Sequence, residues 1–154
     1  MNPHVCYLSY VIRHKYYVFL AGLELGVPLT QLVVHDWHKF LPNEWSPYKE
    51  HFYGNAEVSK DDFDHAWLYH HNKGKHHWQY WVVLDNGDIN PLPMPDRFRR
   101  EMIADWRGCG KALTGSYDAL GWYTANRDKI LLHYETRAWV EEELEYEYYN
   151  DVEL

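Results

Sequence analysis

The chain has 154 residues, of which 46% are hydrophobic and 18% aromatic, and its net charge is −8. A chain of this length buries roughly two thirds of its unfolded surface, so one domain over residues 1–154 can form a core without disulfides. The negative charge argues against binding of duplex nucleic acid, which needs a basic face. No apolar run approaches the ~20 residues that span a bilayer, and the amino terminus lacks the layout of a signal peptide. Because Cys6 and Cys109 are the only cysteines and lie far apart, we expect a cytoplasmic protein with no membrane partner.

The first two predicted elements are helices. Residues 4–25 lack proline, carry apolar residues at helical spacing and are followed by a glycine, which predicts one helix. A second helix is expected from Pro28 to about Phe40, because proline suits a first helical turn and another proline follows Phe40 closely. The segment VVHDWHKF, residues 33–40, would then place its His-Asp doublet in the middle of that helix.

The next stretch predicts two helices and a hairpin. Asn43 can cap a short helix that runs to about Tyr53, and Ser59 can begin another that contains AWLYHHNK and ends at Gly74. The sequence WQYWVVL is aromatic and β-branched, and DNGD is a turn sequence. A small hairpin or an extended loop is therefore expected near residues 78–92.

Helical patterns return after Pro95. They cover about residues 96–113, 117–124 and 126–148, and the glutamate-rich end is expected to fray. The sequence therefore predicts an all-α fold, a single-domain helical bundle with one small hairpin or extended loop.

Polar side chains interrupt the apolar stripes of three predicted helices. His14 lies within the stripe of the first helix, His70 within that of the AWLYHHNK helix, and Asp105 within that of the next long helix. Taken singly, each would more often be a hydrogen-bonded core group. The doublet His35 and Asp36 adds a carboxylate that needs a cation if it is buried. Together these residues predict a divalent metal site, because such ions need convergent imidazole and carboxylate groups.

A second group of histidines follows in the tract HHNKGKHH. His71 is expected to point away from the helix face that carries His70. Gly74 ends the helix, so that His76 or His77 can fold back toward the same interior. We expect this tract to supply either ligands for a second metal ion or an imidazole that binds phosphate.

The order of these residues resembles the HD superfamily of metal-dependent phosphohydrolases. Over most of its length the chain also resembles an uncharacterised family of small phage and bacterial proteins with HDxxKF, AW followed by His, HHW and EMxxDW segments. The superfamily resemblance implies an HD-like helical fold in which one divalent ion is bound by His14, His35, Asp36 and Asp105. In relatives with a second ion, extra histidines lie between the doublet and the late aspartate, a role that His70 and either His76 or His77 could fill.

One departure from the superfamily pattern lies just after the doublet. Many single-metal HD nucleotidases have a catalytic glutamate there, whereas this chain has Trp37, His38 and Lys39. Glu44 is expected to lie too far along the chain to replace it. Lys39 resembles the lysine of other HD subgroups, where a cation beside the metal neutralises phosphate oxygens. The alternative for Lys39 is a solvated charge at a helix end.

These residues lead to the hypothesis of metal-assisted hydrolysis of a nucleotide or related small phosphoester. One or two divalent ions (Mn, Fe, Co, Ni, Mg or Zn) would lower the pKa of a water molecule toward ~7, which lets it attack phosphorus. Asp36 or Asp105 would orient this water. The remaining roles are phosphate binding by Arg13, Lys39 and His76 or His77, and protonation of the leaving oxygen by a histidine such as His77. A base would stack on one of four tryptophans, Trp37, Trp67, Trp78 or Trp81.

Two other functions fit the same residues. The ligands could hold two irons for oxygen chemistry, as in a minority of HD relatives. A non-catalytic module that binds a nucleotide signal or a protein is the alternative from another class. Oxygen consumption without phosphate release would indicate the first, and tight ligand binding without turnover would indicate the second.

Overall fold

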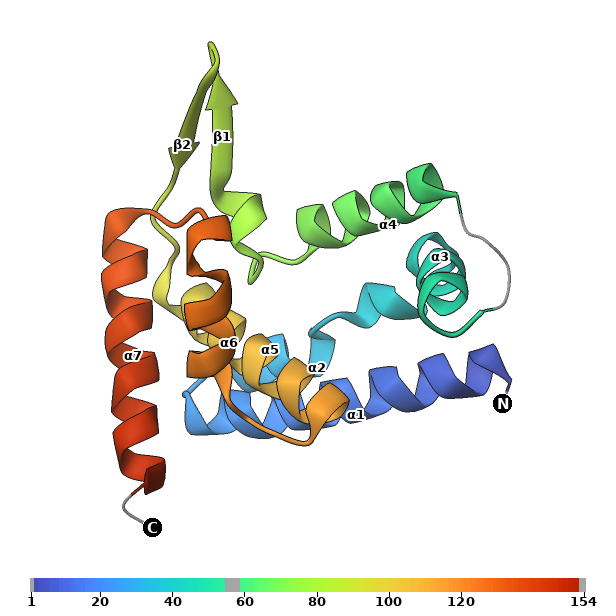
Figure 1. Ribbon diagram of the computed structural model, residues 1–154, viewed down its shortest axis with the longest axis horizontal. Coiled ribbons are helices and arrows are strands. Elements are labelled where there is room, and N and C mark those ends of the chain that lie inside the picture. Colours follow the sequence, from blue (N-terminus) through green and yellow to red (C-terminus); the bar gives the residue numbers. More distant parts are fainter. Residues whose placement is uncertain (1, 55–58, 153–154) are drawn as a thin grey trace.

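The computed structural model describes residues 2–54 and 59–152, with side chains as far as Tyr146. Its α-helices are α1 (Pro3–Glu24), α2 (Leu29–Val34), α3 (Pro42–Tyr53), α4 (Lys60–Lys73), α5 (Asp96–Thr114), α6 (Ala119–Asn126) and α7 (Tyr134–Val152) (Figure 1). The short 3-10 helices are η1 (Trp37–Phe40), η2 (Trp78–Trp81) and η3 (Arg127–Lys129), and the strands are β1 (Val82–Asp85) and β2 (Asp88–Pro91). The prediction of an all-α fold with a small hairpin is therefore confirmed. Among the described helices, none combines the length and apolar character needed to cross a bilayer.

Helices α1 and α5 run side by side in opposite directions at the centre of the fold. Arg100 near the start of α5 donates to the carbonyl oxygen of Leu25 just after the end of α1, 3.1 Å away. Farther along α5, Gly108 lies against Val18, which is about two turns before Leu25 on α1. A β-carbon at Gly108 would lie 2.5 Å from the backbone nitrogen of Val18, so the two helices approach closely there.

Two apolar clusters lie on either side of the middle of α1. The larger one joins the second half of α1 to α5, α6 and α7, with Met102, Ile103 and Val140 among its fully buried members. The smaller one joins the first half of α1 to α3 and α4 through Tyr7 and Tyr48. Figure 1 shows this division, with α3 and α4 at one end of α1 and α5, α6 and α7 at the other. The predicted inward stripe of α1 is confirmed, because all six of its residues are buried: Tyr7, Val11, His14, Val18, Ala21 and Leu25.

The prediction of one helix from Pro28 to Phe40 is wrong, because the helix ends just before the doublet of His35 and Asp36. Helix α2 ends at Val34, His35 is extended, and Asp36 adopts the left-handed conformation with φ of 51° and ψ of 28°. Aspartate tolerates this conformation better than most residues. In an uninterrupted helix two adjacent side chains would diverge by about 100°. The break instead turns both members of the doublet inward, where both are buried.

Other boundaries also differ from the prediction. The cap of α3 is Leu41, so Asn43 lies inside the first turn. The final helix begins at Tyr134 and not near residue 126, because the preceding segment is extended and buries Ile130 and Leu132. Helix α7 runs to Val152. The predicted fraying of the glutamate-rich end stays a prediction, because the last two residues lie outside the described range.

The predicted start of α4 and the hairpin turn are confirmed. Ser59 accepts a hydrogen bond from the backbone nitrogen of Asp62, as an N-cap residue does. In the hairpin, Asn86 and Gly87 both have positive φ, which matches the twist of a two-residue turn between antiparallel strands. The WQYW segment forms η2 instead of extending the strand.

We expect Gly108→Ala to destabilise the protein by about 1–3 kcal/mol, because the new methyl group would overpack the contact between α1 and α5. Helix propensity alone predicts the opposite sign, a gain of about 1 kcal/mol. Urea unfolding followed by circular dichroism measures the difference. A variant more stable than the parent would contradict this account of the helix contact.

Candidate metal centre

Four side chains from three parts of the chain converge beside the middle of α1. His14 comes from α1, His35 and Asp36 from the break after α2, and Asp105 from α5. His14 Nε2 lies 3.3 Å from an oxygen of each aspartate, and His35 Nε2 lies 3.6 Å from Asp36 Oδ2 and 3.4 Å from Asp105 Oδ1. Four tetrahedral ligands with bonds of about 2.0–2.1 Å to an ion lie about 3.3–3.4 Å apart. The spacing therefore fits a divalent ion held by the predicted set.

Several buried polar atoms around Asp36 have no hydrogen-bond partner among the described residues. They include His35 Nε2, His76 Nε2 and Asp36 Oδ1. Burying such atoms unpaired costs free energy, so native proteins satisfy nearly all of them. Imidazole nitrogen and carboxylate oxygen are common ligands of divalent transition metals. The unpaired atoms and their chemistry thus independently fit a bound ion.

Glu101 orients two of the histidines. Its Oε1 lies 2.9 Å from His35 Nδ1 and 3.5 Å from His76 Nδ1, and its other oxygen accepts a hydrogen bond from Gln31. An ionised carboxylate can only accept, so Nδ1 of His35 carries a proton, and when His35 is neutral the lone pair of Nε2 faces Asp36. Sequence reasoning missed Glu101. A signal was present, because Glu101 lies four residues before Asp105 on the same face of α5.

Glu44 holds a second pair of histidines in the same way. It is fully buried, and its two oxygens accept hydrogen bonds from His38 Nδ1 at 2.5 Å and His70 Nδ1 at 3.0 Å. Burial would raise the pKa of Glu44, but the hydrogen bonds from both histidines outweigh it and lower the pKa. That Glu44 lies too far along the chain to replace a catalytic glutamate stays a prediction, but sequence reasoning missed its contacts with His38 and His70. Because η1 turns the chain into α3, Glu44 returns to the residues that follow Asp36.

Three more of the histidines held by Glu44 and Glu101 face Asp36. The Nε2 atoms of His38 and His76 lie 3.7 Å and 3.4 Å from Asp36 Oδ1, and that of His70 lies 3.9 Å from Oδ2. Two overlapping triads can each hold an ion, and both contain Asp36. They are Asp36 with His38 and His70, and Asp36 with His76 and His77. The structure therefore brings together the predicted tract and also His38, which sequence reasoning did not choose.

His71 does not point away from the interior as predicted. It is buried, and its ring lies 4.8 Å from that of His77. The helical period placed His71 on a different face from His70, which is correct for α4 alone. The chain after Gly74 folds back over this face, however, so both histidines become covered.

Lys39 is the cation closest to the predicted ligands. It is buried, and its Nζ lies 2.7 Å from Asp36 Oδ2 and 3.3 Å from His14 Nε2. Burial alone would lower the pKa of Lys39, but Asp36 raises it well above the usual value. Burial would likewise raise the pKa of Asp36, but Lys39 and His35 hold it well below the usual value. The alternative of a solvated charge at a helix end is thus wrong for Lys39.

The remaining histidines of the centre differ in charge. Burial would lower the pKa of His35, but Asp36 and the hydrogen-bonding carboxylates outweigh it and raise the pKa to about 10. Burial lowers the pKa of His14 and of His76 to about 4, and that of His77 well below the usual value. At neutral pH the last three are therefore neutral imidazoles, the form that binds metal ions.

A cavity of about 730 Å³ opens onto this centre. Lys39, His70, His77 and Asp105 line its polar part, and Trp78 lines it as predicted for a base-stacking residue. Aromatic side chains make up much of the rest, namely Tyr10, Tyr48, Phe52, Tyr53, Trp67, Trp106 and Trp122. The cavity has the size of a small-molecule site.

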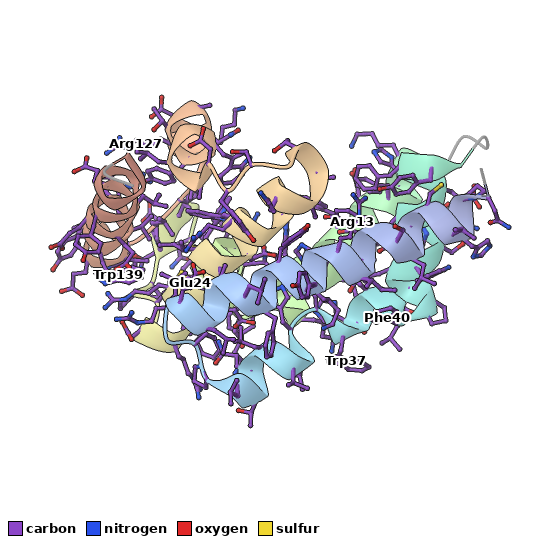
Figure 2. The ribbon with its side chains drawn as sticks, turned by 90° about the horizontal axis from the view of Figure 1, so that it is seen from below. Arg13, Glu24, Trp37, Phe40, Arg127 and Trp139 are labelled. Carbon is purple, nitrogen blue, oxygen red and sulfur yellow. The ribbon has the colours of Figure 1, made fainter. Side chains whose placement is uncertain are left out.

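Two predicted phosphate-binding residues do not line this cavity. His76 is buried behind it, next to Glu101. Arg13 is exposed on α1, and its guanidinium donates to the backbone oxygen of Ser9 (Figure 2). The cation that faces the cavity beside the predicted ligands is Lys39.

We expect Glu44→Gln to lower the free energy of unfolding by about 1–3 kcal/mol, because an amide has one acceptor oxygen and cannot accept from both His38 and His70. Urea unfolding of the metal-free protein measures this loss. The matched control is Glu50→Gln in the same helix, which changes a more exposed ion pair with Lys49 and should cost less than about 1 kcal/mol. Equal losses in the two variants would contradict the orienting role of Glu44.

Comparisons with known proteins add a family but no activity. No curated protein and no solved structure matches the chain significantly. A family model described as a family of unknown function (DUF5662) matches residues 4–146, a range that contains every ligand and both orienting glutamates named above. The chain therefore belongs to the DUF5662 family.

Proposed function

We propose that this protein is a metal-dependent phosphohydrolase that acts on a nucleotide or a related small phosphoester. The observation that carries the proposal is the convergence of His14, His35, Asp36 and Asp105 at the spacing of an ion's ligands. Two of the four, His14 and Asp105, line a cavity large enough for a nucleotide. The order of these four residues along an all-α chain is also that of the HD superfamily, which this chain resembles.

A divalent ion in this centre would supply a Lewis acid that lowers the pKa of a water molecule toward ~7. The protein side chains position the reactants. Asp105 lines the cavity while its Oδ1 faces His14 and His35, so its Oδ2 is the oxygen available to orient a water. Lys39 lines the same wall and carries a positive charge that can neutralise phosphate oxygens.

His77 and Trp78 would contact the substrate beyond the phosphate. Because burial keeps His77 neutral, we assign it a hydrogen bond to a phosphate oxygen and not the protonation of the leaving group. Its Nε2 has no partner among the described residues, which leaves it available for that bond. Trp78, together with Trp67 and Trp106, gives the cavity aromatic surfaces on which a nucleobase can stack.

A second ion belongs to the same proposal. Asp36 Oδ2 lies beside His14 and His35, with His70 3.9 Å away, and Oδ1 lies beside His38 and His76. Two groups of side chains that share Asp36 would therefore hold two ions, and a second ion would help to stabilise the attacking and leaving oxygens of a displacement. We favour the triad of Asp36, His38 and His70 for the second ion, because Glu44 fixes both imidazoles with Nε2 directed at Asp36.

Elemental analysis of the purified protein, combined with a phosphate-release screen, tests this proposal. The screen covers nucleoside mono-, di- and triphosphates, cyclic nucleotides and bis(p-nitrophenyl) phosphate, each with Mn, Co, Ni, Mg, Zn and ferrous ions. We expect one or two bound ions per chain and turnover of at least one substrate class. Replacing Asp36 by Asn should remove the ions and lower turnover at least about 100-fold, because the amide carries no negative charge to hold an ion.

Asp36→Asn also leaves Lys39 buried without its carboxylate, so folding is checked by circular dichroism. Asp105→Asn is the second variant, because it removes a ligand and leaves the pair of Lys39 and Asp36 in place. Asp64→Asn, in an exposed pair with Lys60, is the matched control and should keep both ions and activity. Full metal content in folded Asp36→Asn and Asp105→Asn would contradict the proposed ligands.

Lys39→Gln should separate metal binding from catalysis. Removing an ammonium from beside two ligands removes a charge that repels a divalent ion, so we expect metal affinity to be equal or higher. The same change removes the cation offered to the phosphate, so kcat should fall about 100-fold. The measurements are calorimetric titration with Mn²⁺ and steady-state kinetics on the best substrate. An unchanged kcat would contradict the role of Lys39.

Two further measurements, made beside the phosphate-release screen, decide between this proposal and its two alternatives. Oxygen consumption with ferrous ions and no phosphate release would replace hydrolysis by oxygen chemistry. Nucleotide binding measured by tryptophan fluorescence, without turnover in any metal, would replace it by a binding module. Either outcome contradicts the hydrolase and leaves the metal centre to be judged by its ion content.

A further inference from the structure

Helix α1 has two apolar faces, and only one of them is covered. The inner stripe that carries His14 is buried throughout. On the opposite side, five large apolar side chains are each 39–58% exposed: Val5, Leu8, Ile12, Tyr16 and Leu23. Their spacing of three, four or seven residues keeps them on one side of the helix. A helix that is apolar on both sides is normally buried on both.

Two exposed aromatic residues extend this face. Trp37 and Phe40 of η1 are 54% and 45% exposed, whereas His38 and Lys39 between them are buried. Lys15, on the flank of α1 between the two stripes, donates to the carbonyl oxygen of His35 and so joins α1 to this segment. Figure 2, seen from below, shows α1 in front of the other helices, with Trp37 and Phe40 beside one edge of α1. We call these seven residues the α1 outer face.

The size of the α1 outer face matches one half of a dimer interface. Seven large apolar side chains, each about half exposed, present roughly 700 Å² of surface. A stable interface of standard size buries about 800 Å² on each partner. The largest apolar patch on a typical monomer covers about 300–600 Å². The face is thus larger than a monomer normally leaves open.

Charge indicates which partner covers this face. The chain carries a net charge of −8, so two copies repel each other over most of their surfaces. None of the seven residues of the α1 outer face is charged. A second copy can therefore approach this face with little repulsion and with a gain in buried apolar area. A two-fold dimer also uses the same patch on both subunits, which one continuous apolar helix face provides.

We infer that the protein forms a homodimer in which the α1 outer faces of two copies pack against each other. The inference does not depend on the proposed hydrolase activity. In such a dimer Trp37 and Phe40 are buried, so the partner packs directly behind the segment that carries His38 and Lys39.

Light scattering coupled to size-exclusion chromatography tests the dimer on the full chain at micromolar concentrations. The unaltered protein should have twice the chain mass of 18.6 kDa. Ile12→Glu, at the centre of the α1 outer face, should weaken the dimer at least 100-fold and give a monomer, because dimerisation would bury an unpaired charge. Leu8→Glu is a second variant with the same expected result.

The matched control is Leu84→Glu. Leu84 is 76% exposed on the hairpin, which projects from the side of the molecule opposite α1 (Figure 1). This variant carries the same added charge and should remain a dimer. Circular dichroism confirms that each variant is folded, which is expected because the replaced side chains are exposed. An unaltered protein that is monomeric at all concentrations, or a dimer that survives both α1 variants, would overturn the inference.

Discussion

The structure depends on how the buried negative charge of Asp36 is balanced. Its side chain is fully buried, and an isolated carboxylate there would cost several kcal/mol. Lys39 supplies one positive charge at 2.7 Å, and His35, whose pKa is raised to about 10, supplies another. A divalent ion brings the same two charges to the same place. The metal-free protein can therefore fold around Asp36, and an ion can then take over the charge that the His35 proton provides.

Two glutamates fix the direction of the imidazoles around that charge. Glu101 holds His35 and His76, and Glu44 holds His38 and His70, in each case through Nδ1. Because an ionised carboxylate accepts and never donates, the neutral forms of His35, His38 and His70 keep their proton on Nδ1 and direct the lone pair of Nε2 toward Asp36. For His35 this form arises when an ion displaces its second proton. In the other tautomer, the proton would lie on Nε2 and an N–H group would take the place of a candidate metal ligand. Burying Glu44 and Glu101 costs desolvation, but it makes the centre ready for an ion before the ion arrives.

The helical period allowed the inward residues to be predicted, and the turns between helices limited that prediction. The stripes of α1 and α5 are regular, so His14 and Asp105 could be placed inside from their spacing alone. The break at Asp36 could not, because the side chains that hold it come from distant parts of the chain. Glu44 was missed for the same reason. It lies six residues beyond His38, and only the turn through η1 into α3 brings the two together.

Helix packing and ligand geometry are coupled at this centre. His14 and Asp105 lie on α1 and α5, and their ligand atoms are 3.3 Å apart although the two helices are more than 70 residues apart in sequence. Histidine and aspartate side chains are short, so a wider separation of the helices would place these atoms beyond the reach of one ion. Gly108, one turn from Asp105, removes the side chain that would otherwise hold α5 away from Val18. The apolar packing of two long helices thus sets the distance between two polar atoms, and loosening that packing would move these two candidate ligands apart.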